Sequence, residues 1–107
     1  MDIRIQNEID LIKKSILQTV SAEAIYLFGS HAYGTPNDDS DLDIYVVVPD
    51  DIMDLPELQA DIRELLWGKK TVPLDLLIGK SATFHRRKNG PTFEGMIAKK
   101  GMLLYGS

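Results

Sequence analysis

Two aspartates placed two positions apart define the segment of this sequence with the most specific chemistry. Asp41 and Asp43 enclose Leu42, and an apolar run from Ile44 to Val48 follows directly. Side chains alternate across a strand, so both carboxylates would leave the same face, with their α-carbons roughly 7 Å apart. At that separation they can share a metal cluster, and carboxylate oxygens are ligands that Mg²⁺ accepts. The pair therefore predicts a divalent-metal site at the start of a strand.

This acidic segment has two other interpretations. In the first, Asp41 caps a turn and Asp43 faces solvent, as in any acidic turn before an ordinary strand. The second, an EF-hand calcium loop, is excluded because no glycine stands at its sixth position and an apolar strand follows where a helix should begin. Two further features favour the metal interpretation: Gly29-Ser30 upstream and Asp75 downstream.

The dipeptide Gly29-Ser30 ends a short apolar run, Ala24 to Phe28, which predicts a buried strand that closes in a turn. Gly-Ser is common in loops, so a plain turn is the alternative. The segment is neither a Walker A loop nor a dinucleotide fingerprint, because it lacks the glycine and lysine spacing of both. Residues 30–34 can instead begin a helical turn whose free N–H groups would point at an anion. Beside a pair of metal ions, such a turn suits nucleotidyl transfer.

A third carboxylate interrupts the next strand candidate, which runs from Val72 to Ile78. Asp75 shares a face there with Pro73 and Leu77. Burying an isolated carboxylate in an apolar run costs free energy unless a metal or a donor meets it. The alternative is an edge-strand position that faces water, so Asp75 is a candidate third ligand.

The pattern Gly-Ser-x3-Gly-x5-Ser-Asp-x-Asp, from Gly29 to Asp43, resembles the signature of the polymerase-β-like nucleotidyltransferases. Nearly the whole chain is similar to the minimal branch of that superfamily. This resemblance implies that Asp41, Asp43 and Asp75 are the catalytic residues and hold Mg²⁺. It also implies that Asp75 is the base that accepts the proton of the incoming hydroxyl.

The same resemblance implies a nucleotide site at Gly29, Ser30 and Ser40. In the family, Ser30 and the nearby backbone amides would hold the β and γ phosphates of a nucleoside triphosphate such as ATP, since a hydroxyl can both donate and accept. The chain departs from the pattern at Tyr33, where many members carry an arginine. His31 is also unusual, and we expect a surface position at the turn for it rather than a ligand role.

Small members of this family are often paired with a HEPN-domain protein as antitoxin and toxin, and they transfer AMP from ATP to a tyrosine of the toxin. The resemblance therefore implies this activity and a helical partner chain. One alternative is a stand-alone or homo-oligomeric nucleotidyltransferase that acts on a small hydroxylated molecule. The other is a non-catalytic subunit that only binds nucleotide.

The elements that must position these residues follow from apolar periodicity. Helical spacing predicts an amphipathic helix over residues 3–20, and a second helix carries Leu58 to Leu66 and is closed by Gly68. Strands are expected over 24–28, 41–48 and 72–78, with a short helix near Pro91 and a last apolar piece over 102–105. The first two strands must run antiparallel to share a site. We expect one α+β domain over residues 1–107, a small mixed sheet with helices packed mainly on one face.

Composition limits the remaining function classes. The chain has 107 residues, no cysteine and a net charge of −4, so thiolate metal sites are excluded and general nucleic-acid binding is not expected. No apolar stretch approaches the length of a membrane span, and residues 1–4 lack the order of a signal peptide, so we expect a cytoplasmic protein. The basic run from His85 to Lys88 is either a solvated face or a contact for triphosphate or an acidic partner.

Overall fold

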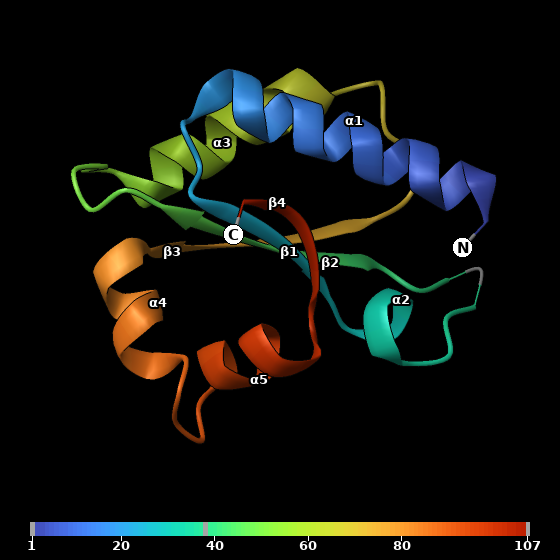
Figure 1. Cartoon of the computed structure of the whole chain (residues 1–107). Coiled ribbons are helices and arrows are strands. Elements are labelled where there is room, and N and C mark those ends of the chain that lie inside the picture. Colours follow the sequence, from blue (N-terminus) through green and yellow to red (C-terminus); the bar gives the residue numbers. More distant parts are fainter. Residues whose placement is uncertain (1, 38, 107) are drawn as a thin grey trace.

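The computed structural model describes residues 2–37 and 39–106, so residues 1, 38 and 107 of the expected domain lie outside the described residues. One four-stranded sheet with helices on both faces makes up the structure (Figure 1). Its elements in chain order are α1 (Ile3–Thr19), β1 (Ala24–Phe28), α2 (Ser30–Tyr33), β2 (Leu42–Val48), α3 (Leu55–Leu66), β3 (Leu74–Lys80), α4 (Ser81–Arg87), α5 (Phe93–Lys100) and β4 (Met102–Gly106).

The sheet is mixed, with the strand order β3-β2-β1-β4. The central strand β1 runs antiparallel to β2 and β4, which confirms the expected antiparallel pair. The edge strand β3 runs parallel to β2, and α3 makes the crossover between them. Consequently the end of β1 and the beginnings of β2 and β3 meet at one edge of the sheet, the edge that is formed by strand ends and not by the outer strand β3.

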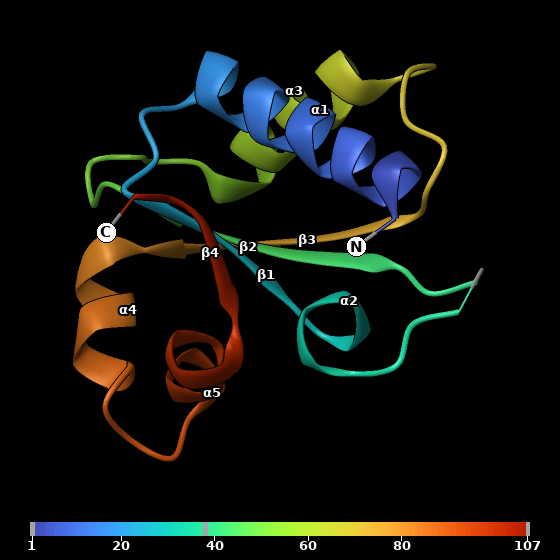
Figure 2. The ribbon, with the colours of Figure 1, turned by 45° about the vertical axis from the view of Figure 1, so that its right-hand side comes forward.

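The two long helices, α1 and α3, lie side by side on one face of the sheet (Figure 2). Their apolar stripes meet one face of β2, where alternate residues are fully buried. Burying each such side chain contributes about 1.5–3 kcal/mol, so this layer is the main source of stability. Its most buried members are Ile9, Ile12, Ile16, Ile25, Leu27, Leu42, Ile44, Val46, Val48, Ile62 and Leu66.

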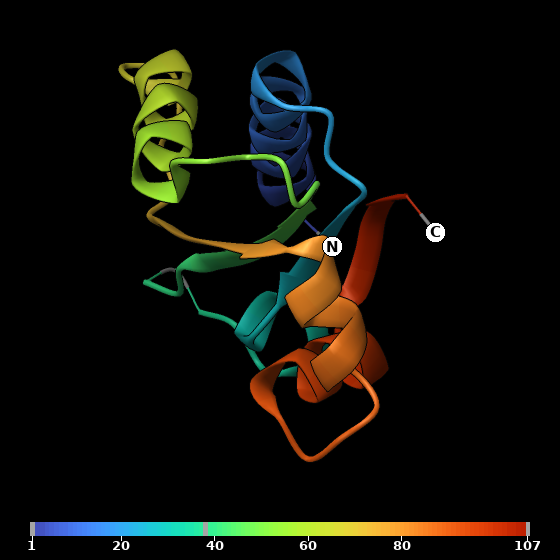
Figure 3. The same cartoon turned by 90° about the vertical axis from the view of Figure 1, so that its left-hand side faces the viewer.

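The three short helices lie on the opposite face (Figure 3). A smaller core beneath them is largely aromatic, with Phe84 of α4 stacked near Tyr45, and Phe93 of α5 set edge-on against Phe28. The α+β class and the mixed sheet of the nucleotidyltransferase fold are therefore as predicted. The longer helices share one face, and the short helices supply a second layer that holds the other face of β2.

Several elements differ from the sequence prediction. Strand β2 begins at Leu42 rather than at residue 41, so Asp41 lies just before the strand. Strand β3 begins at Leu74 rather than Val72, because the backbone N–H groups of Thr71 and Val72 donate to the buried carboxylate of Glu8, at 2.6 and 2.7 Å. Helix α4 was not predicted, since Phe84 is its one buried residue and no apolar stripe marks it. In the described part of the chain, no helix combines the length and apolar character needed to cross a membrane.

Candidate active site

Gly29 and Asp43 fit against each other at the end of β1. Asp43 is the register partner of Phe28, so its carboxyl group reaches the point where the chain leaves the strand. Gly29 has φ +77°, a backbone conformation that residues other than glycine rarely adopt. A β-carbon at position 29 would also overlap Oδ2 of Asp43. The missing side chain of Gly29 therefore makes the space that the Asp43 carboxylate occupies.

Asp43 and Asp75 face each other across β2 and β3. They are register partners in the parallel pair, so their side chains leave the same face at the same rung. Burial raises the pKa of the Asp43 carboxyl above its usual range, and the carboxylates of Asp75 and Asp41 add to this rise, while His31 opposes it. Three carboxyl groups are therefore concentrated where β2 and β3 begin.

The carboxyl groups have the chemistry of a magnesium site without being closed around a common point. Among residues 2–37 and 39–106, no three acidic or histidine side chains are already arranged to hold one ion. The arrangement is a facing pair, Asp43 and Asp75, with Asp41 close enough to influence Asp43. Such oxygen donors fit Mg²⁺, and a cation would relieve the repulsion among them. The residues present therefore fit the implied metal.

Helix α2 places Ser30 at the same edge, directly after Gly29. The amides of Ala32 and Tyr33 donate to the Gly29 carbonyl at 3.0 and 3.1 Å, which fixes this turn against the end of β1. Ser30 is half-buried and opens the turn, directly after Gly29, which fits against the carboxylate of Asp43. The predicted helical start over residues 30–34 is thus present, and the contact of Ser30 with phosphate stays a prediction.

The loop before β2 is organised by Ser40 and His31. The hydroxyl oxygen of Ser40 accepts a hydrogen bond from the Asn37 amide at 2.9 Å. Nε2 of the half-buried His31 lies 3.3 Å from the Ser40 carbonyl oxygen, so α2 is tied to the chain just before Asp41. Ser40 directly precedes Asp41 and its hydroxyl is engaged in the turn, while its role in nucleotide binding stays a prediction. His31 does more than the expected surface residue, because it holds the two halves of the motif together.

Glu8 is a supporting residue that the sequence analysis missed. Its carboxylate accepts both amide hydrogens that precede β3, and it is only 7% exposed. This contact fixes the entry of β3 and so helps to set Asp75 opposite Asp43. A signal was present in the sequence, because Glu8 interrupts the apolar stripe between Ile5 and Ile12.

Comparison with known proteins shows which family the chain matches. A family model described as "Polymerase beta, Nucleotidyltransferase" matches residues 10–107. That range includes the turn at Gly29, all three aspartates and every strand of the sheet. No curated protein matches the chain.

Solved structures share the fold. A mutant MntA-HpeT toxin-antitoxin complex, with two aspartates two positions apart changed to glutamate, matches with TM-score 0.64 and 23% identity, over 92% of this chain and 73% of that chain. A toxin-antitoxin structure with AMP-PNP matches with TM-score 0.58 and 25% identity, over 94% and 74%. A candidate nucleotidyltransferase from Sulfolobus solfataricus matches with TM-score 0.58 and 21% identity, over 99% and 89%.

Proposed function

The chain belongs to the polymerase beta nucleotidyltransferase family, and from this premise we propose that it is an antitoxin that transfers AMP from ATP to a tyrosine hydroxyl of a HEPN-domain toxin. Two of the similar structures are toxin-antitoxin complexes, and one of them contains AMP-PNP, an analogue of ATP. Their likeness to this chain supports a partner protein and a nucleotide substrate.

One observation carries the proposal: Gly29, Asp43 and Asp75 come from three strands' ends and meet at one edge. A phosphate on the Ser30 turn would lie beside the carboxyl pair. Divalent cations held by Asp41, Asp43 and Asp75 would neutralise charge on the phosphates and on the attacking oxygen. A phosphate-binding turn beside a group of carboxylates suits phosphoryl transfer, because that reaction depends on positioning and on stabilisation of charge.

In the proposed reaction, the tyrosine oxygen forms a bond to the α-phosphorus of ATP while the bond from that phosphorus to the bridging oxygen breaks. Pyrophosphate leaves, and the phenol proton passes to the carboxylate of Asp75. Ser30 and the adjacent backbone amides hold the leaving phosphates. Asp41 and Asp43 would hold a divalent cation, which would supply positive charge beside the α-phosphate.

The proposal is tested by incubating the chain with ATP, Mg²⁺ and the HEPN-type protein encoded beside it, followed by intact-mass spectrometry of that neighbour. We expect one or more AMP units on the neighbour, localised to tyrosine by peptide mapping. Omitting Mg²⁺ or replacing Asp41 by asparagine should abolish the adduct. An unmodified neighbour, together with steady AMP transfer to a small hydroxylated compound, would contradict the antitoxin role.

A further inference from the structure

Strand β4 forms one lateral border of the sheet, and its outer side has no partner strand among the described residues. We propose that this side binds β4 of a second copy of the chain, antiparallel and about a two-fold axis, so that two four-stranded sheets join into one. The inference goes beyond AMP transfer, because it concerns the outer strand and not the strand ends that carry the carboxyl groups.

The outer side of β4 is open to solvent in the described part of the chain. Figure 3 shows the strand at the border of the sheet, with α1 and α3 set back over the other strands. Strand β1 pairs with its inner side only. The backbone N–H and C=O groups on the free side of a border strand are a template for pairing with another strand. Strand β4 therefore offers such a template.

The other border strand, β3, is protected in ways that β4 is not. Asp75 and Lys80 place charges on β3, and Nε2 of Gln59 donates to the Leu76 carbonyl oxygen at 2.7 Å. Charged side chains and covering groups are usual means of preventing border strands from pairing. Strand β4 has the sequence Met-Leu-Leu-Tyr-Gly, without charge or proline. The contrast favours β4 as the strand that pairs.

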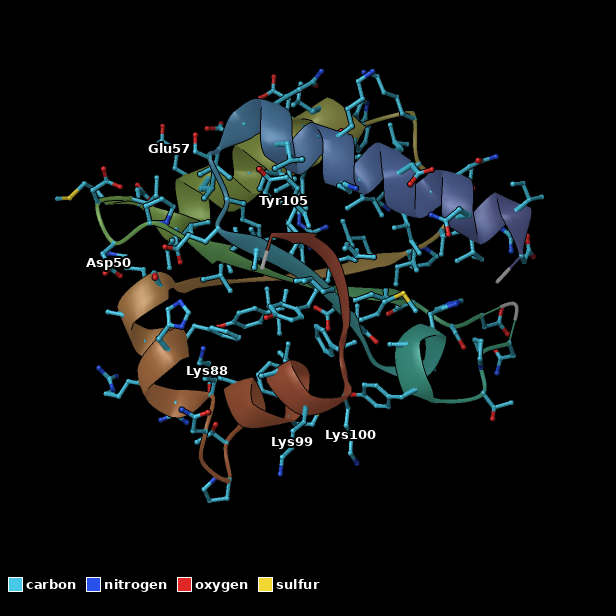
Figure 4. All side chains as sticks on the ribbon, viewed as in Figure 1. Asp50, Glu57, Lys88, Lys99, Lys100 and Tyr105 are labelled. Atoms are coloured by element: carbon cyan, nitrogen blue, oxygen red, sulfur yellow. The ribbon has the colours of Figure 1, made fainter. Side chains whose placement is uncertain are left out.

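Exposed apolar side chains accompany the free backbone of β4. Met102, Leu103 and Tyr105 are 43%, 44% and 41% exposed, and Tyr105 lies on the side of the sheet that carries α1 (Figure 4). The register places Leu103 on the face of Tyr26 and Tyr105 on the face of Ile25, so both faces of β4 present apolar surface. A strand placed beside β4 would remove part of this surface from water, which is favourable.

Charges at the two ends of β4 favour a second copy in the antiparallel direction. Lys99 and Lys100 directly precede the strand (Figure 4). The half-exposed Glu23, 3.7 Å from Nε2 of His85, lies at the other end, beside the β1 residue that pairs with Gly106. In an antiparallel pair the start of one β4 lies beside the end of the other, so the lysines of each copy approach Glu23 of the partner subunit. A parallel pair would place lysines beside lysines.

The length of β4 sets the strength of the assembly. Five residues span roughly 17 Å, so the strand pair is shorter than the contact of a standard complex, which buries about 800 Å² per partner. We therefore expect a dissociation constant on the order of 10 µM. A two-fold contact is closed, so it produces a dimer and no fibre. The strand ends with Asp43 and Asp75 stay open in both copies.

The first test is sedimentation velocity of the full chain, at concentrations from about 1 µM to about 500 µM, on either side of the expected dissociation constant. We expect monomer at the low end and dimer at the high end. A chain that stays monomeric throughout this range, or that grows beyond a dimer, would overturn the inference. Neither result bears on AMP transfer, which is measured separately.

A matched pair of variants localises the contact. Leu103→Lys places a charge on β4, whereas Leu65→Lys changes the same residue type, 37% exposed, on α3 and beyond α1 from β4 (Figure 3). We expect Leu103→Lys to weaken dimerisation by at least about tenfold, and Leu65→Lys to leave it unchanged. Thermal unfolding checks that both variants fold. Undiminished dimerisation of folded Leu103→Lys, or equal weakening by both changes, would overturn the inference.

Single cysteines measure the direction of pairing without adding charge, and they are specific because the chain has no cysteine of its own. In an antiparallel two-fold pair, residues near the middle of the strand meet their own counterparts, and residues before its start do not. Under mild oxidation we expect Leu103→Cys to form a disulfide-linked dimer and Lys100→Cys to stay monomeric. Linking of both variants would indicate a parallel pair, and linking of neither would remove β4 from the contact, so either result would overturn the inference.

Discussion

The two faces of β2 differ in almost every physical respect. On one face Leu42, Ile44 and Val46 are fully buried beneath α1 and α3, in a closed aliphatic layer. On the other face the strand begins with a half-buried carboxylate, Asp43, and continues with Tyr45 into an aromatic layer under short helices. The closed face can supply stability because nothing must enter it. The second face can carry a reactive edge because the first one holds the strand in place.

The largest effect on activity should come from the open face. Replacing Asp43 by asparagine removes a charged ligand of the proposed metal site but keeps the shape that fits against Gly29. We expect AMP transfer to fall about a thousandfold, a loss typical of removing one group that stabilises developing charge. Thermal stability should stay equal or rise, because the substitution removes one of three neighbouring negative charges and so reduces the repulsion among them.

The control for this comparison is Asp61→Asn, at an exposed position of α3. It should leave both transfer and melting temperature unchanged. Single-turnover transfer and thermal unfolding measure the two properties separately. Undiminished transfer by Asp43→Asn would remove this residue from the active site.

The closed face should respond in stability instead. Ile44 is 0% exposed, and Ile44→Ala deletes buried methylene and methyl groups and leaves a cavity. We expect a loss of about 2–5 kcal/mol in the free energy of unfolding, measured by urea titration. Transfer per folded molecule should be kept at temperatures where the variant is folded. If transfer fell while the unfolding free energy stayed constant, the division between the two faces would be wrong.

Two glycines separate backbone strain from crowding at the site. Gly29 and Gly68 both have positive φ, +77° and +74°, but only a β-carbon at Gly29 would meet other atoms. Gly68→Ala should cost about 1 kcal/mol of stability through strain alone. Gly29→Ala should cost more, and should also lower transfer by at least about tenfold because the Asp43 carboxylate must move. Equal effects of the two changes on transfer would show that the contact with Asp43 is unimportant.

The smallest effect should come from the ion pair that ties α4 to α5. Nε of Arg87 donates to Glu94 at 2.8 Å, and this hydrogen bond lowers the pKa of Glu94 below its ordinary value of 4.5. A depressed pKa in the folded state means that the stabilisation is present above the unfolded-state value and is lost as the pH falls through the folded-state value. We expect a coupling of about 0.2–1 kcal/mol in a double-mutant cycle with Arg87→Gln and Glu94→Gln.

The coupling should be measured at neutral pH and again well below pH 4.5, where it should vanish because Glu94 is protonated. The hydroxyl of Tyr45, whose pKa burial raises to about 12, also faces Glu94 and stays neutral throughout this range. A coupling that persisted at low pH would mean that packing of the two side chains, rather than charge, joins the helices.

Much of the fold could be predicted because its signals are local. Helix α1 and strand β1 follow from apolar spacing, and their observed bounds agree with the expected ones to within a residue. The antiparallel pairing of β1 and β2 followed from the need to bring Gly29 and Asp43 together, and the register confirms it. Helix α4 escaped prediction because one buried residue, Phe84, gives no periodic signal.

The sequence by itself determined which residues are candidates for the chemistry, because residue type and alternation along a strand are local properties. Asp41 and Asp43 stay close because they are two positions apart, although β2 begins only at Leu42, and Gly29-Ser30 follows the strand that ends at Phe28. Only the tertiary structure decided that β3 lies beside β2 with Asp75 level with Asp43. Strand neighbours and helix positions depend on contacts between distant segments, and these are fixed when the two cores close around the sheet.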